Sequence, residues 1–121
     1  MPNNSSDPTS VGSRSNDPTV LILTSLASEP RHGYALLQDI EDFAGVRLGP
    51  GILYGAIGRL EGRGLIEATG AAGRRRPYRI TPAGAETLRA AIAELRTIVN
   101  AGTERLGALP APGAALAGGA E

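Results

Sequence analysis

Three prolines stand at positions where helices begin, and they fix where the main elements of the chain can lie. Asp17-Pro18 and Thr81-Pro82 each combine a side chain that can cap a helix with a proline at the first helical position, where no backbone donor is lost. Pro50 precedes a third stretch in which apolar residues recur at helical spacing. Helices are therefore predicted to begin close to residues 18, 50 and 82.

Two helices are predicted before Pro50. Residues 20–26 are mostly apolar, and their β-branched side chains would also suit a strand. The cap before them and the length of the run favour a buried helix, which Pro30 and Gly33 end. Residues 45–49 form a connector with room for a short strand. The second helix is predicted from about Tyr34 to Phe43, with Tyr34, Leu37, Ile40 and Phe43 or Ala44 on one apolar face.

The third helix, from Pro50 to just before Gly64, has two contrasting faces. One face is apolar, and the other carries glycines flanked by Tyr54 and Arg59. Each glycine costs about 1 kcal/mol of helix propensity relative to alanine. Such a face is either under no constraint or lies where a partner approaches the backbone closely, and the pattern leaves both interpretations open. The apolar positions are Leu53, Ala56, Ile57 and Leu60, and the glycines are Gly51, Gly55, Gly58 and Gly62.

A β-hairpin is predicted after the third helix. Residues 65–69 and 78–80 have strand-like patterns, and residues 70–73 form a loop between them. Pro77 fits only the start of a strand or an edge strand. The expected fold class is mainly α with a small β-hairpin, because three short helices followed by a hairpin is the winged helix-turn-helix arrangement. The second and third helices would form the helix-turn-helix pair, and the hairpin would form the wing.

One long helix is predicted from residue 82 to residue 109. Its apolar positions alternate at spacings of four and three, which is a heptad seam with Gly102 as its one gap. We therefore expect this helix to pair with a second copy of the chain. The seam consists of Leu88, Ile92, Leu95, Val99, Gly102, Leu106 and Leu109, and the expected dimer contacts are Leu88, Ile92, Leu95, Val99 and Leu106.

The predicted domain organisation follows from these elements. Residues 17–81 would form the winged-helix domain and residues 82–109 the dimerisation helix. Residues 1–16 and 110–121 are expected to be disordered tails, because their side chains are too polar or too small to form a core. We expect a cytoplasmic protein, since no secretory signal is recognisable and the longest apolar run is too short to span a bilayer.

The charge distribution indicates a partner that carries phosphates. The formal net charge is zero and all 12 basic residues are arginine. Seven arginines lie between positions 47 and 79 against two glutamates, so this segment carries a formal charge of +5. Many charge runs are only solvated, but guanidinium groups at a hairpin mouth suit a DNA backbone. The predicted DNA-binding residues are Tyr54, Gly55, Gly58, Arg59, Arg63, Arg74, Arg75, Arg76 and Arg79.

Catalytic and metal-binding functions find little support in the sequence. His32 is the only histidine, and it stands in a turn before a helix, where a capping role is the ordinary one. Asp39, Glu41 and Asp42 are interpreted as a solvated helix face rather than an acid and base pair. There is no cysteine, and no lysine to hold a nucleotide phosphate. We therefore expect no catalytic residue, metal or cofactor.

The sequence resembles the PadR family of bacterial transcriptional regulators. The matching motifs are HGYAL at residues 32–36, GPGILY at 49–54, RLE at 59–61, GLI at 64–66 and GRRRPYRITPAG at 73–84. The resemblance implies a winged helix-turn-helix domain and a dimer formed through the C-terminal helix, often packed with the first helix. It also implies repression from palindromic operators, released in many members by a small aromatic or cationic effector.

Carried over by position, the resemblance places Tyr54, Gly55, Gly58 and Arg59 in the major groove and residues 74–76 in the wing. The chain departs from the family where Gly55 replaces a common proline and Gly58 a larger polar residue. With no Trp and one Phe, it does not support an aromatic effector pocket. The expected partners are double-stranded DNA, a second copy and a small-molecule effector. The alternative is a winged-helix module that binds protein without sequence-specific DNA binding.

Overall fold

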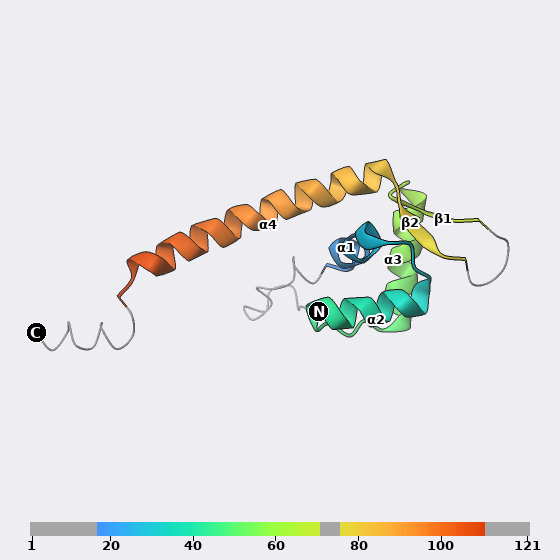
Figure 1. Ribbon diagram of the computed structural model, residues 1–121, viewed down its shortest axis with the longest axis horizontal. Helices are drawn as coiled ribbons and strands as arrows, with labels where there is room; N and C mark the ends of the chain where they lie inside the picture. The colour runs from blue at the N-terminus through green and yellow to red at the C-terminus, as the bar shows by residue number, and fades with distance from the viewer. Residues whose placement is uncertain (1–16, 71–75, 111–121) are drawn as a thin grey trace, which may run out of the picture. The chain divides into compact units, whose positions relative to one another are not determined.

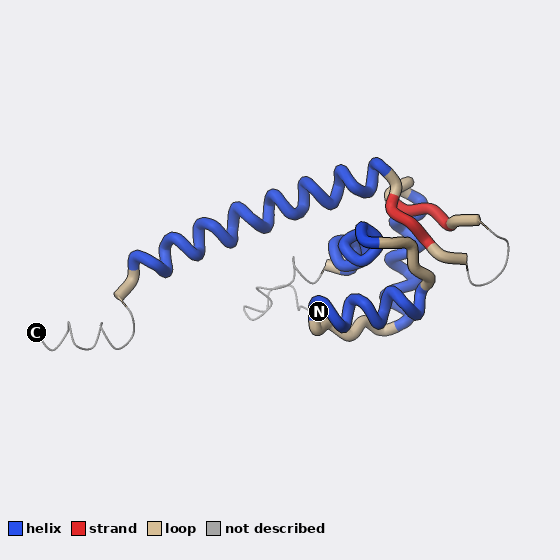
Figure 2. Tube along the Cα trace, viewed as in Figure 1, coloured by secondary structure: helices blue, strands red, loops and turns tan. Residues whose placement is uncertain are grey.

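The structure, a computed structural model, describes residues 17–70 and 76–110. The described residues are mainly helical with one two-stranded antiparallel hairpin, as predicted (Figures 1 and 2). The connector at residues 45–49 contains no strand. In chain order the elements are α1 (Pro18–Ser28), α2 (Gly33–Ala44), α3 (Pro50–Gly62), β1 (Ile66–Ala68), β2 (Tyr78–Ile80) and α4 (Pro82–Ala108).

Helices begin at Pro18, Pro50 and Pro82, as predicted, and side-chain hydrogen bonds cap the first and the last of these. The Asp17 carboxylate accepts from the Thr19 backbone N–H at 2.9 Å, and Pro18 follows the cap. The Thr81 hydroxyl accepts from the Gly84 N–H at 3.0 Å and donates to the Gly64 carbonyl at 2.7 Å. Gly64 has a backbone φ of +76°, which residues with a side chain rarely adopt, and it ends the turn after α3. Thr81 thus caps α4 and also ties its first turn to the end of α3.

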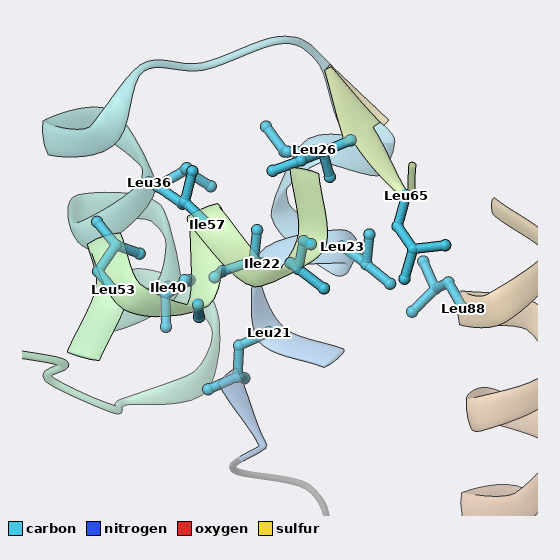
Figure 3. Packing of buried hydrophobic residues seen from close by; sticks show 13 residues of the cluster. Leu21, Ile22, Leu23, Leu26, Leu36, Ile40, Leu53, Ile57, Leu65 and Leu88 are labelled. Carbon is cyan, nitrogen blue, oxygen red and sulfur yellow. The ribbon is translucent and has the colours of Figure 1, made fainter. Parts of the chain in front are cut away.

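The core forms where α1 packs against α2, α3 and β2. Side chains from the three helices point toward one another in Figure 3. The apolar face predicted for α3 is confirmed, since all four of its residues are buried. Burial of such side chains supplies most of the stability of a small domain, at about 25 cal/mol per Å² of apolar surface. The core residues of α1 and α3 are Leu21, Ile22, Leu23, Leu26, Leu53, Ala56, Ile57 and Leu60.

The apolar face predicted for α2 is partly wrong. Tyr34 is 68% exposed and Phe43 is 46% exposed, whereas Leu36 and Ile40 are fully buried. The helix is rotated so that Gly33 and Leu36, rather than Tyr34, face the core. Gly33 faces the core because Tyr54 of α3 packs closely against it. The sequence pattern does not show this contact, because glycine has no apolar side chain.

The chain divides into two compact units, one ending at Ala91 and the other beginning at Ile92. The first unit therefore includes the first part of α4, beyond the boundary predicted at residue 81. Gly84 is buried, and a methyl group there would overlap the Leu65 carbonyl oxygen, so this glycine lets α4 pack closely. Leu88 is 7% exposed and joins the core beside Leu65 (Figure 3). Leu88 is thus a core residue of its own chain rather than a free member of the seam.

The second unit contains the remainder of α4. Its large apolar side chains are exposed except for Leu95, which is half-buried. Ile98 belongs to this exposed set although the heptad pattern omits it. No helix of the described residues has both the length and the hydropathy needed to cross a membrane. The exposed apolar residues are Ile92, Ile98, Val99, Leu106 and Leu109.

Candidate nucleic-acid interface

The hairpin has one face toward the core and one toward solvent. Ile66 pairs with Ile80, and the next pair along the ladder is Glu67 with Arg79. Because side chains alternate across a strand, the two isoleucines pack on the core while Glu67 and Arg79 point outward. The outward face of the described hairpin is therefore charged.

A turn residue holds the hairpin against the helices. The Arg31 N–H donates to the Tyr78 carbonyl at 3.0 Å, and the Tyr78 N–H donates to the Arg31 carbonyl at 2.8 Å. This isolated bridge adds the turn between α1 and α2 to the edge of β2. The position of the wing is therefore set partly by residue 31.

The Arg31 side chain is fixed by a polar network and is only 18% exposed. Its guanidinium donates to the Ser28 hydroxyl at 2.9 Å and to the Ser25 carbonyl at 3.3 Å. It also forms ion pairs with Glu29 at 3.3 Å and Asp39 at 3.6 Å. The charge pattern of the sequence does not reveal this positioning role, because it singles out only the arginines after residue 46.

Asp39 does not lie on a solvated helix face, contrary to the prediction. The sequence predicts a solvated helix face, but the Asp39 carboxylate accepts a hydrogen bond from the Ser25 hydroxyl at 2.7 Å and pairs with Arg31. Ser25 is the one buried polar side chain of the described residues. A buried hydroxyl needs a partner, and Asp39 supplies it across the α1–α2 interface. Asp39 is therefore a structural residue.

The glycine face of α3 has no packing reason inside the described chain. A methyl group added at Gly51, Gly58 or Gly62 would meet nothing within 4 Å. At Gly55 it would meet only a terminal nitrogen of Arg59, at 3.7 Å. The fold therefore does not require glycine at any of these positions, and the face is open to a partner.

Tyr54 has both a packing role and an exposed surface. Its side chain is half exposed, as the sequence predicts for the flank of α3. The ring lies against Gly33 at the start of α2, where a methyl group would overlap the Tyr54 hydroxyl. This contact sets how closely the two helices of the helix-turn-helix pair approach each other.

The arginines of α3 and of the hairpin differ in their partners. Arg59, Arg63 and Arg76 are exposed and have no ion-pair partner in the described part of the chain. Arg79 is paired with Glu67 at 2.7 Å. Because α3 packs against β1, these side chains come from neighbouring elements. Arg74 and Arg75, also predicted to bind DNA, lie outside the described residues.

Arg47 is the second paired arginine of the basic segment. Its guanidinium donates to the Glu41 carboxylate at 2.9 Å, and this hydrogen bond, together with the opposite charge, raises the pKa of Arg47. The pair partly offsets the positive charge that the sequence assigns to residue 47. Among the described arginines of this segment, those without an ion-pair partner in the described residues are therefore Arg59, Arg63 and Arg76.

The acidic residues and the histidine of residues 17–70 and 76–110 form no metal-binding cluster. No group of three or more histidine, aspartate or glutamate side chains there could hold a metal ion. His32 occupies the N-cap position of α2, but its side chain forms no capping hydrogen bond. The arrangement as described is a winged helix-turn-helix with exposed arginines on α3 and the hairpin.

Comparison with known proteins identifies the family of this winged-helix protein. The model of the transcriptional regulator PadR-like family matches residues 22–90, and the chain belongs to that family. Its members are transcription regulators and not enzymes. The resemblance seen in the sequence motifs is thereby confirmed.

Solved structures of the family share the fold. A PadR family transcription regulator from Clostridium difficile is 26% identical, with a TM-score of 0.65 over 74% of this chain and 97% of that chain. A PadR family regulator from Eggerthella lenta is 28% identical, with a TM-score of 0.67 over 84% of this chain and 91% of that chain.

A curated relative is more similar in sequence but much longer. It is an uncharacterized 37.1 kDa protein in a transposon of Streptomyces fradiae, 51% identical over 75 residues. The match covers 62% of this chain and 22% of that protein. The chain therefore spans about a fifth of the length of the curated relative that it matches.

Proposed function

We propose that the protein is a cytoplasmic DNA-binding repressor that recognises a palindromic operator as a homodimer. The observation that carries this proposal is a set of three exposed arginines on α3 and the hairpin, Arg59, Arg63 and Arg76, which have no ion-pair partner within residues 17–70 and 76–110. A guanidinium without an intramolecular partner can bind a phosphate without first losing an ion pair. Family membership supports the same function.

In the proposed complex, α3 enters the major groove. Tyr54 and Arg59 contact the DNA from the flanks of the helix, and Gly55 and Gly58 allow the backbone to approach closely. Glycines offer no side chain for reading base edges, so recognition depends more on DNA shape and on phosphate contacts. The remaining contacts come from Arg63 and from the wing arginines, Arg74, Arg75, Arg76 and Arg79.

The dimer is proposed to form through the exposed apolar face of α4. Ile92, Val99 and Leu106 recur at heptad spacing and are exposed in the single chain, and Leu95 is half-buried between them. Such a seam buries its side chains against the same seam of a second helix. We expect the two α3 helices to contact half-sites about 34 Å apart, one turn of DNA.

Release of DNA by a small-molecule effector is a further part of the proposal. The family resemblance supports an effector, but the sequence has no Trp and one Phe. We therefore expect an effector that does not depend on stacking between several aromatic side chains. A thermal-shift screen in the presence of operator DNA would identify compounds that stabilise the protein and displace the DNA.

The test is a gel shift of the purified protein with the DNA upstream of its own gene, in the presence of non-specific competitor DNA. Binding that survives competitor and weakens with salt would support a sequence-specific regulator. Absence of a shift even at low salt would contradict the proposal. A shift that competitor abolishes would leave DNA binding but contradict operator recognition.

A wing variant tests which residues bind the phosphates. Replacing Arg74, Arg75 and Arg76 together with alanine should weaken binding to all DNA sequences alike and reduce the dependence on salt. The slope of log K against log salt should become shallower by about 0.9 for each phosphate that the variant no longer neutralises. Unchanged affinity would show that the wing does not bind the backbone.

One observation favours a second candidate function, a winged-helix module that binds protein. The open glycine face of α3 would also accept a protein partner, since nothing in the described chain covers it. Such a partner would be recovered by pull-down after nuclease treatment. Loss of that partner on replacing Gly58 with glutamate, with no change in DNA binding, would favour this alternative.

A further inference from the structure

One arginine of the proposed DNA interface is already bound by the protein itself. The Arg79 Nε lies 2.7 Å from the Glu67 carboxylate, with the two side chains 59% and 48% exposed. The pair lies directly across the strand ladder, so the strand register holds the two groups side by side. Arg59, Arg63 and Arg76, by contrast, have no such partner among the described residues.

We propose that Glu67 is an affinity-limiting residue of the DNA interface, which competes with phosphate for Arg79. This inference rests on the proposed DNA-binding function. Both side chains project from the solvent-facing side of the hairpin, so a phosphate that reaches Arg79 also meets the Glu67 carboxylate. The screening length at physiological salt is about 8 Å, so salt does not screen the repulsion between this phosphate and the nearby Glu67 carboxylate.

The hairpin does not depend on this ion pair for its position. The Thr69 N–H donates to the Pro77 carbonyl at 2.8 Å, and the Thr81 N–H donates to the Leu65 carbonyl at 3.0 Å. The Arg31 bridge holds the other edge of β2, and Ile66 packs into the core. A structural role alone therefore does not account for Glu67, because exposed ion pairs contribute little to stability.

Sequence-independent DNA binding comes almost wholly from interactions with phosphates. An arginine whose charge is offset by glutamate adds little to that binding. Glu67 thus lowers the affinity of the wing for any DNA, so less of the protein is held at non-operator sites. Removal of its charge should release Arg79 and strengthen DNA binding, a gain that a misfolded protein could not produce.

The experiment compares the wild-type chain with Glu67→Gln, which keeps the shape of the side chain and removes its charge. We expect binding to both operator and random DNA to tighten by about threefold per wing, roughly tenfold for a dimer. The slope of log K against log salt should steepen by about 0.9 per wing. Glu67→Thr, a strand-compatible second variant, should show the same gain if Glu67→Gln fails to fold.

Two control variants separate release of Arg79 from other effects. Glu61→Gln makes the same change in net charge on α3, but Glu61 has no ion-pair partner in the described residues. Glu86→Gln breaks an ion pair of the same kind, with Arg89 at 2.6 Å on α4. Neither should reproduce the gain. A gain with Glu61→Gln equal to that with Glu67→Gln would overturn the proposal in favour of bulk charge.

A double-mutant cycle with Arg79→Gln completes the test. Arg79→Gln should weaken binding in the wild-type background, because it leaves the Glu67 charge without its partner beside the phosphates. The double variant should bind about as the wild type does, so the gain of Glu67→Gln over the wild type should be lost when Arg79 is absent. Weaker or unchanged binding of Glu67→Gln, with normal wild-type binding, would overturn the role of Glu67 and leave the proposed function intact. Absence of salt-dependent binding by the wild type would contradict the proposed function, and this inference with it.

Discussion

The two units of the chain use apolar residues in opposite ways. In the unit that ends at Ala91, Leu53 and Ile22 are fully buried, and even Leu88 of α4 is drawn into the core. In the unit that begins at Ile92, the leucines, isoleucines and valine of α4 remain exposed except for the half-buried Leu95. The first unit thus has a buried core of its own, although Tyr34, Phe43, Ile52 and Tyr54 remain exposed on its surface. In the second unit, by contrast, the described residues leave most of the apolar side chains exposed.

This difference separates the apolar residues that stabilise the fold of one chain from those that we propose stabilise the dimer. A helix whose apolar stripe faces water gains little from tertiary packing and is stabilised when that stripe is covered. We infer that the winged unit folds by itself and that the distal part of α4 is completed by a second copy. Substitutions in the two units should therefore have different consequences.

The largest effect is expected in the core. Leu53→Ala should lower the free energy of unfolding of the winged unit by about 2–5 kcal/mol, because it removes a fully buried side chain and leaves a cavity. Urea unfolding at several protein concentrations should give the same decrease at each. Leu106→Ala should instead act through the dimer, so that its effect depends on concentration.

The next effect is on assembly. Leu95→Arg places a charge in the seam and should raise the dimer dissociation constant by more than about a hundredfold, equivalent to about 3 kcal/mol. Sedimentation velocity should show a single chain of 12.4 kDa for the variant and twice that mass for the wild type. Thr97→Arg, on the opposite side of the helix, is the matched control and should stay dimeric. A dimeric Leu95→Arg would place the interface elsewhere.

Two glycine substitutions give smaller and opposite effects. Gly84→Ala should destabilise the winged unit by about 1–3 kcal/mol, because the new methyl group overlaps the Leu65 carbonyl oxygen. Gly58→Ala meets nothing and should stabilise α3 by up to about 1 kcal/mol. Thermal unfolding compares the two. If Gly58→Ala also weakens DNA binding, the open face is one that DNA approaches closely.

Most of the fold could be predicted from the sequence, because its determinants are local. The caps at Asp17 and Thr81, the prolines that follow them and the glycine after α3 mark the ends of helices through their own backbone chemistry. The rotation of α2 could not be predicted, since it depends on the approach of Tyr54 to Gly33. That contact joins residues on different helices and leaves no periodic pattern.

The candidate site could be predicted less completely. Composition identifies the arginines of α3 and the wing, but it cannot show which of them are paired. The Glu67–Arg79 pair depends on strand register, and the network of Arg31, Asp39 and Ser25 depends on helix packing. Both are tertiary features, so a charged residue in a sequence does not reveal whether its charge is available to DNA.

If the arginines of the winged unit bind DNA phosphates, the affinity of the protein for DNA must fall as the salt concentration rises. Fluorescence anisotropy with labelled operator DNA should give a slope of log K against log salt near −7 if the dimer neutralises about eight phosphates. Such a slope is the predicted result. A slope near zero would contradict a DNA-binding function for this surface.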